Sequence, residues 1–122
     1  MKTLDSDNKV VVLSKEEATR KAVSSTLGKA GFTIVPASSA DDALHLCQGL
    51  NPPARLAIVD GDSEFLPRLR RACPAMRVLF MASSEAEESG LRGGRVLHKP
   101  FRRAQLLGTV LDVLREPLAF TA

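Results

Sequence analysis

Aromatic side chains are scarce in this chain, which has no tryptophan, no tyrosine and only five phenylalanines among 122 residues. The phenylalanines fall mostly in apolar stretches, so the aromatic platforms on which single-stranded bases stack are missing. The formal net charge is +3, and basic and acidic residues are interspersed along the chain. Such a modest excess is a weak indication of nucleic-acid binding. We therefore expect no nucleic-acid partner, and a basic nucleic-acid-binding domain stays as the alternative from another functional class.

Cysteine and histidine are also rare, and their spacing predicts no metal site. Cys47 and Cys73 stand among apolar and small neighbours without a CxxC motif, which favours buried thiols that act as small hydrophobic side chains. His45 and His98 are single imidazoles without a partner at metal-ligand spacing, so we assign no role to either. No segment approaches the roughly 20 apolar residues of a membrane helix. We expect a reduced, cytoplasmic protein with no membrane partner.

Short apolar runs recur along the chain and alternate with stretches of helical period. The runs that predict strands lie at 10–13, 32–35, 56–59, 78–81 and 96–97. Because these strands are continuously apolar and separated by helices, they predict an α/β fold with one doubly wound parallel sheet covered on both faces. The length suits one core, so we expect a single domain over 1–122 with its core in 9–115.

Three of the intervening stretches have clear helical spacing. They lie at 16–30, 40–50 and about 102–115. Ser14 is a candidate N-cap for the first helix, and Gly28 and Gly31 are expected to close it. The second helix is expected to start after Ser38 and Ser39.

Polar residues follow the apolar runs at the edge where open α/β folds place their chemistry. Asp60 ends the third run, and Lys99 precedes Pro100 after the fifth. Ser14 and Lys15 follow the first run, where a divalent-cation site beside Asp60 would need acidic oxygens. Lys15 either points into solvent or pairs with Asp60 in place of a cation, and the sequence leaves both readings open.

Five segments carry a resemblance to a known family. In order, VVVLSKEEATRKAV, AGFTIVPASSADDAL, RLAIVDGD, VLFMAS and HKPFRRAQLL resemble the receiver domain of bacterial two-component response regulators over about residues 9–115. The resemblance implies a five-stranded, flavodoxin-like (CheY-like) sheet of order 2-1-3-4-5. It also implies that Asp60 is the phospho-acceptor-like residue, Lys99 the family's lysine and Pro100 its cis proline. In that family an acidic pair after the first strand holds Mg²⁺.

The chain departs from the family pattern at the other site positions. Ser14 and Lys15 fall on the acidic pair, and Val96 replaces the usual aromatic switch residue. Ala82 falls on the hydroxyl position after the fourth strand, unless a register shift of one residue restores it with Ser83. These substitutions predict a site that keeps its acceptor and has lost its metal ligands and both switch residues.

Two acidic residues near the site could rescue a metal centre. Glu16 and Asp62 lie close to it in sequence, although each is also suited to a helix start, where the dipole favours negative charge. The third and fourth helical connections are shortened, and glycines at 90, 93 and 94 argue against a long fourth helix. The basic group Arg68, Arg70 and Arg71 is interpreted as a solvated helix face.

We therefore interpret the chain as a stand-alone, degenerate receiver without enzymatic activity or cofactor, which signals by binding another protein. The alternative is a working receiver that takes phosphate on Asp60 from a histidine kinase and binds Mg²⁺. The expected partner is a histidine kinase or downstream effector, with a homodimer possible. We expect docking on the fourth-helix remnant, the fifth strand and the last helix, around Leu91, Val96, Arg102 and Arg103.

Overall fold

The apolar runs of the sequence form five parallel strands in one sheet. The structure is a computed structural model and describes residues 8–50, 54–60, 66–74, 76–84 and 95–115. The strands are β1 (Lys9–Leu13), β2 (Thr33–Ala37), β3 (Leu56–Asp60), β4 (Arg77–Ala82) and β5 (Arg95–His98). Their order is β2-β1-β3-β4-β5, and all neighbours are parallel. The predicted doubly wound sheet is confirmed.

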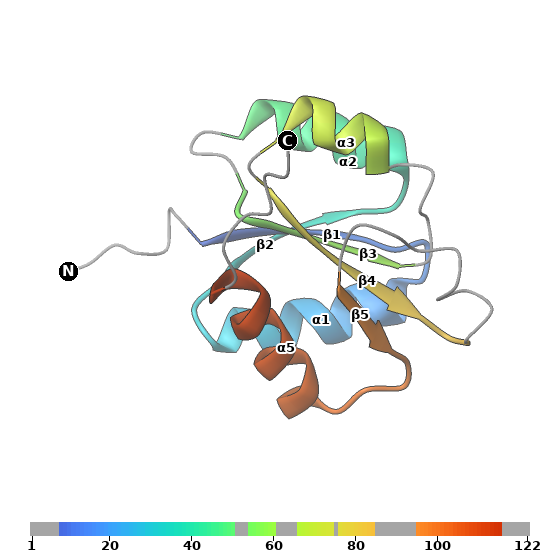
Figure 1. Cartoon of the computed structure of the whole chain (residues 1–122). Coiled ribbons are helices and arrows are strands. Elements are labelled where there is room, and N and C mark those ends of the chain that lie inside the picture. Colours follow the sequence, from blue (N-terminus) through green and yellow to red (C-terminus); the bar gives the residue numbers. More distant parts are fainter. Residues whose placement is uncertain (1–7, 51–53, 61–65, 75, 85–94, 116–122) are drawn as a thin grey trace.

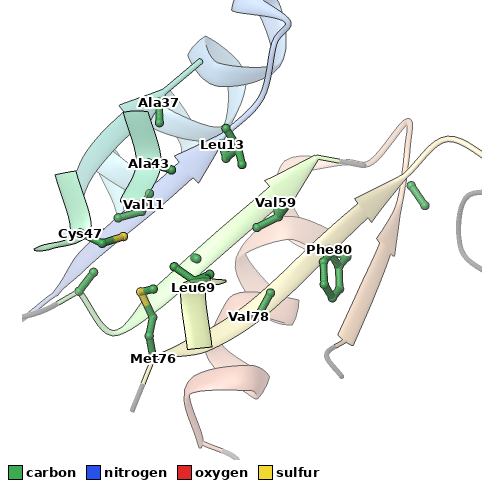
Figure 2. Close-up of a cluster of buried hydrophobic side chains, with 13 residues drawn as sticks. Val11, Leu13, Ala37, Ala43, Cys47, Val59, Leu69, Met76, Val78 and Phe80 are labelled. Atoms are coloured by element: carbon green, nitrogen blue, oxygen red, sulfur yellow. The ribbon is translucent and has the colours of Figure 1, made fainter. Parts of the chain in front are cut away.

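Helices cover both faces of the sheet, as the continuously apolar strands require (Figure 1). The helices α1 (Glu17–Lys29) and α5 (Arg103–Arg115) pack on one face. The helices α2 (Ala40–Gly49) and α3 (Leu66–Ala72) pack on the other, where Figure 2 shows Leu69 and Phe80 among the buried side chains of the cluster. Alternate residues of β1, β3 and β4 therefore enter opposite cores, which leaves their polar carboxyl ends to form a site.

The helix starts differ in how they are capped. Ser39 caps α2, because its hydroxyl accepts the N–H of Asp42 at 3.1 Å, as expected. The prediction that Ser14 caps the first helix is wrong: Glu16 is the N-cap residue, and its side chain makes no capping bond. The other prediction for this helix is correct only in part, because Gly28 lies inside α1, while Gly31 follows it with a φ of 100°.

Strand β2 extends beyond its predicted end. Its residues include Pro36, which the sequence reading placed after the strand. Because β2 is an edge strand, the missing N–H of a proline need not interrupt a hydrogen-bond ladder. The shortened third connection matches α3, which has seven residues. The fourth connection, with its glycines and Leu91, lies outside the described residues.

The two cysteines lie in the α2/α3 face and are both free thiols. Cys47 is buried, whereas Cys73 is half-buried. Burial raises the pKa of the Cys47 thiol to about 12, and the neighbouring Cys73 adds to this rise. Within the described residues, no helix combines the length and apolarity needed to cross a membrane.

Candidate functional site

The carboxyl ends of three strands bring a serine, an aspartate and a lysine together. Asp60 is the last residue of β3, Ser14 follows β1 directly, and Lys99 follows β5. Strand β1 is the hydrogen-bonded neighbour of β3, with Leu13 beside Val59, so the next residue of each chain segment, Ser14 and Asp60, lies at the same level of the sheet. These three residues and Glu16 are called the Asp60 cluster below.

Both oxygens of the Asp60 carboxylate are engaged by protein groups. The Ser14 hydroxyl donates to Oδ2 at 2.8 Å. The Lys99 ammonium lies 3.0 Å from Oδ2 and 3.0 Å from Oδ1. Only 10% of the Asp60 side chain is exposed, so these contacts act where water screens them weakly. The negative charge of Asp60 is thus compensated inside the protein.

Ser14 is held rigidly in this position. It is buried, with 1% of its surface exposed, and its N–H donates to the carbonyl of Ala37 at 3.1 Å. Its carbonyl accepts the guanidinium of Arg20 at 2.6 Å, and its Oγ accepts the N–H of Glu16 at 3.1 Å. The hydroxyl hydrogen is directed at Asp60, because the other acceptor near it, the carbonyl of Glu16, is farther away at 3.5 Å. The sequence reading missed this contact, although a small hydroxyl residue one strand from Asp60 could have indicated it.

Lys99 bridges two carboxylates. Its ammonium lies 3.2 Å from Oε1 of Glu16, in addition to its contacts with Asp60. Burial alone lowers the pKa of Lys99, but hydrogen bonds to Asp60 and Glu16 and their negative charges outweigh it, so the pKa lies above its ordinary value. The N–H of Lys99 donates to the carbonyl of Ala82 at 2.8 Å, and the peptide bond to Pro100 is cis, as the resemblance implies.

Glu16 reaches the cluster from its solvent side. Its side chain is 64% exposed, and its Oε1 also accepts the Thr19 hydroxyl at 2.9 Å. The hydrogen bond from Thr19, followed by the hydrogen bond and the charge of Lys99, lowers the pKa of Glu16. The carboxylate of the rescue candidate Glu16 therefore joins the cluster through Lys99, whereas its backbone N–H joins through Ser14. The other candidate, Asp62, lies outside the described residues.

Lys15 takes the solvent-exposed alternative that the sequence left open. Its side chain is exposed, and within the described part of the chain no hydrogen bond or ion pair joins it to Asp60. Lys99 and Ser14 occupy both carboxylate oxygens instead. The suggestion that Lys15 replaces the cation is not supported.

Sequence comparison gives no family: no family model matches the chain, and no curated protein matches it. Structural comparison identifies the fold. The chemotaxis protein CheY4 of Vibrio cholerae superposes with a TM-score of 0.77 at 23% identity, covering 88% of this chain and 98% of that one. A response regulator from Thermotoga maritima superposes with a TM-score of 0.78 at 21% identity, covering 90% of this chain and 99% of that one. A response regulator receiver protein from Sinorhizobium medicae WSM419 superposes with a TM-score of 0.74 at 21% identity, covering 88% of this chain and 94% of that one.

The chain has the fold of a CheY-like receiver domain. In this receiver fold the ends of β1, β3 and β5 meet at one edge, which is where Ser14, Asp60 and Lys99 lie. The order of strands that the resemblance implied is confirmed.

The two predicted switch positions of this receiver fold are apolar. Ala82 ends β4 and is fully buried, so no hydroxyl stands at that strand end. Ser83 follows outside the strand with an exposed side chain. Val96 lies beside Phe80 in the register of β4 and β5. It is half-buried and packs against the core on the α2/α3 face of the sheet.

The described residues around Asp60 do not fit Mg²⁺. This ion needs near-octahedral oxygen ligands at about 2.0–2.1 Å. Ser14 is neutral, donates its hydrogen to Asp60 and leaves no second carboxylate at the end of β1. The described part of the chain holds no group of three acidic, histidine or cysteine residues placed to bind a metal. The receiver fold is therefore present without a matching ligand set in these segments.

The remaining charged candidates lie away from the cluster. Arg68 of α3 forms an ion pair with Asp41 of α2 at 2.7 Å, and both side chains are largely exposed. Arg70 and Arg71 are exposed on the same short helix. His45 is exposed on α2, and nothing in its surroundings gives it a role.

Proposed function

We propose that this protein is a degenerate receiver module that works in signal transduction by binding other proteins, without enzymatic activity of its own. One observation carries the proposal. At the position where the resemblance implies a metal-binding carboxylate, the buried hydroxyl of Ser14 donates to Asp60 at 2.8 Å. The residues that would activate Asp60 as a phosphoryl acceptor are thus replaced by a residue that holds it.

The electrostatics of the cluster support the same proposal. Transfer of a phosphoryl group brings negative charge to the acceptor, which a cation in the site normally neutralises. Here one ammonium, that of Lys99, faces the charges of Asp60 and Glu16. Lys15, at the second position of the expected acidic pair, contributes a positive charge that disfavours a divalent cation nearby.

A working receiver that takes phosphate from a histidine kinase on Asp60 is the second candidate. The feature that favours it is Glu16, whose carboxylate lies 3.2 Å from the same ammonium as Asp60 and is open to solvent. In that case Glu16 would supply the acidic oxygen that Ser14 lacks.

Incubation with a small phosphodonor and Mg²⁺, followed by intact-mass measurement, separates the two candidates. We expect no mass gain in the parent chain. As a matched positive variant, Ser14→Asp with Lys15→Asp restores the acidic pair and is expected to gain one Mg²⁺-dependent phosphoryl group. That gain should disappear when Asp60→Asn is added. A Mg²⁺-dependent gain in the parent chain, lost in Asp60→Asn, would establish the second candidate.

The proposed partner is a signalling protein, a kinase or an effector, that docks on β5 and α5, and a second copy of the chain is a further occupant to test. Leu111 on α5 is the large hydrophobic side chain that the described residues leave exposed, at 38%, and Arg102 and Arg103 lie exposed at the start of the same helix. Leu111→Glu should reduce self-association or partner capture, whereas Ala22→Glu on the exposed side of α1 should not. Equal binding by both variants would remove this surface.

A further inference from the structure

Eight of the fifteen lysines and arginines among the described residues lie at the end of the sheet opposite the Asp60 cluster, where described acidic residues are few. Parallel strands all begin at one edge, and the helices that connect them end there (Figure 1). The basic residues at strand starts and helix ends are Lys9, Lys29, Arg55, Arg70, Arg71, Arg77, Arg95 and Arg115. We call this set the basic end.

The described acidic residues lie mostly at the other end. They are Glu16, Glu17, Asp41, Asp42 and Asp60, at two helix starts and one strand end. Asp112, one turn before the end of α5, is the exception. Among the described residues the basic end therefore holds eight cations and one acid, which leaves a positive excess.

Six of these cations are exposed, and two of the six, Arg70 and Arg95, already interact within the fold. The other four lie on separate elements. Lys29, Arg71 and Arg115 stand in the last turns of α1, α3 and α5, and Arg55 directly precedes β3. Arg55 donates one N–H to Asn8 at 3.2 Å, which leaves its other donors for a ligand. Lys9, Arg77 and Arg95 have interactions of their own within the fold and add to the positive field.

Helix dipoles explain only part of this arrangement. A cation near a helix C-terminus stabilises the helix, which accounts for Lys29 and Arg115. That effect does not account for Arg55 and Arg77, which stand on neighbouring strands and are joined by a backbone hydrogen bond of 3.1 Å. A row of cations across strand starts and helix ends is a surface suited to an anion.

The side chains at this end favour a polyphosphate backbone over a protein. Specific protein interfaces are built around an apolar centre, whereas the one large hydrophobic side chain that the described residues leave exposed is Leu111, near the end of α5. Guanidinium groups match phosphate oxygens in geometry and charge. Since the chain has no tryptophan or tyrosine for stacking on bases, a duplex suits it better than a single strand.

We propose that the basic end binds the phosphate backbone of duplex nucleic acid independently of sequence. Lys29, Arg55, Arg71 and Arg115 make the contacts. The surface lies at the opposite edge of the sheet from Asp60, so this binding is independent of the function proposed for that cluster.

Fluorescence anisotropy of a short labelled DNA duplex of arbitrary sequence, titrated with the protein over a series of salt concentrations, tests the proposal. Each phosphate contact contributes about −0.9 to the slope of log affinity against log salt, so four contacts predict a slope of about −3.6. Arg55→Ala combined with Arg71→Ala should make the slope less negative by about 1.8 and weaken binding at low salt by roughly tenfold or more.

The matched control is Arg102→Ala combined with Arg103→Ala, which removes two exposed arginines from the start of α5 at the other end. It changes the net charge equally and should retain nearly the parent slope. If α3 tolerates substitution poorly, judged by circular dichroism, Lys29→Ala with Arg55→Ala replaces the test pair. Equal weakening in test and control pairs, a parent slope near zero, or tighter binding of polyglutamate than of the duplex would each overturn the proposal.

Discussion

Replacing Lys99 by methionine should destabilise the fold by removing the ammonium that compensates Asp60. Methionine keeps a long unbranched side chain, so the change removes the charge and its hydrogen bonds while leaving most of the packing volume. Asp60 would remain 10% exposed in the native geometry, with the Ser14 hydroxyl as its remaining donor in the cluster. A nearly buried carboxylate without its counter-charge is costly.

The magnitude follows from the distances. At 3.0 Å and an effective dielectric of about 20, the attraction between Lys99 and Asp60 is roughly 5 kcal/mol before desolvation. Burying both groups offsets part of it, and breaking a fully buried pair costs about 3–5 kcal/mol. Since Lys99 is still 17% exposed, we expect a loss just below that range, about 2–3 kcal/mol. The contact with Glu16, which is 64% exposed, is screened by solvent and adds little.

Urea unfolding at neutral pH, followed by circular dichroism, measures this loss. Lys15→Met is the matched control, because Lys15 also follows a strand at this edge but is exposed, and it should stay within about 0.5 kcal/mol of the parent. A double-mutant cycle of Lys99→Met and Asp60→Asn should show a coupling above about 1 kcal/mol. Additive effects in that cycle, or equal losses for the two lysines, would refute the reasoning.

Four further predictions concern pH dependence, helix capping and thiol reactivity. Because the pKa of Lys99 is raised above 10.5, its contribution is complete below that pH and is lost as pH rises through the raised value, so Lys99→Met should lack this alkaline loss in urea unfolding. The lowered pKa of Glu16 gives a contribution present above pH 4.5 and lost as pH falls through the lowered value, so Glu16→Gln should unfold with a shallower acid limb. Ser39→Ala should cost about 1 kcal/mol in the free energy of unfolding by removing the α2 cap. Iodoacetamide should modify half-buried Cys73 before buried Cys47, whose pKa is about 12, as read by peptide mass mapping, and the reverse order would contradict the packing.

The sequence determined most of the fold because the strands and helices are strongly patterned. Continuous apolar runs located all five strands to within two residues, since parallel strands buried on both faces leave no polar interruption. The wrong predictions concern residues whose structure depends on their position in the folded protein. Pro36 continues β2 because that strand is at the edge, and Ser14 does not cap α1 because its hydroxyl is drawn to Asp60.

The sequence predicted only those site residues whose type and position suggest a single role. Asp60 at a strand end and Lys99 before Pro100 are part of the resemblance to receiver domains, which implied that both residues belong to one site. The structure places their charged groups 3.0 Å apart. The partners Ser14 and Glu16 had several plausible roles in sequence, as caps or lost ligands. Only the adjacency of β1 to β3 and the reach of Lys99 decide between them.

A titration with Mg²⁺ and beryllofluoride, read by backbone amide NMR shifts around Asp60, tests the central claim most directly. Beryllofluoride mimics a phosphoryl group on a carboxylate and needs the metal site that Ser14 and Lys15 replace. We predict no saturable shifts at Val59 or Asp60 at millimolar Mg²⁺, and saturable shifts in the variant with Ser14→Asp and Lys15→Asp. Saturable shifts in the parent chain that Asp60→Asn abolishes would contradict the account.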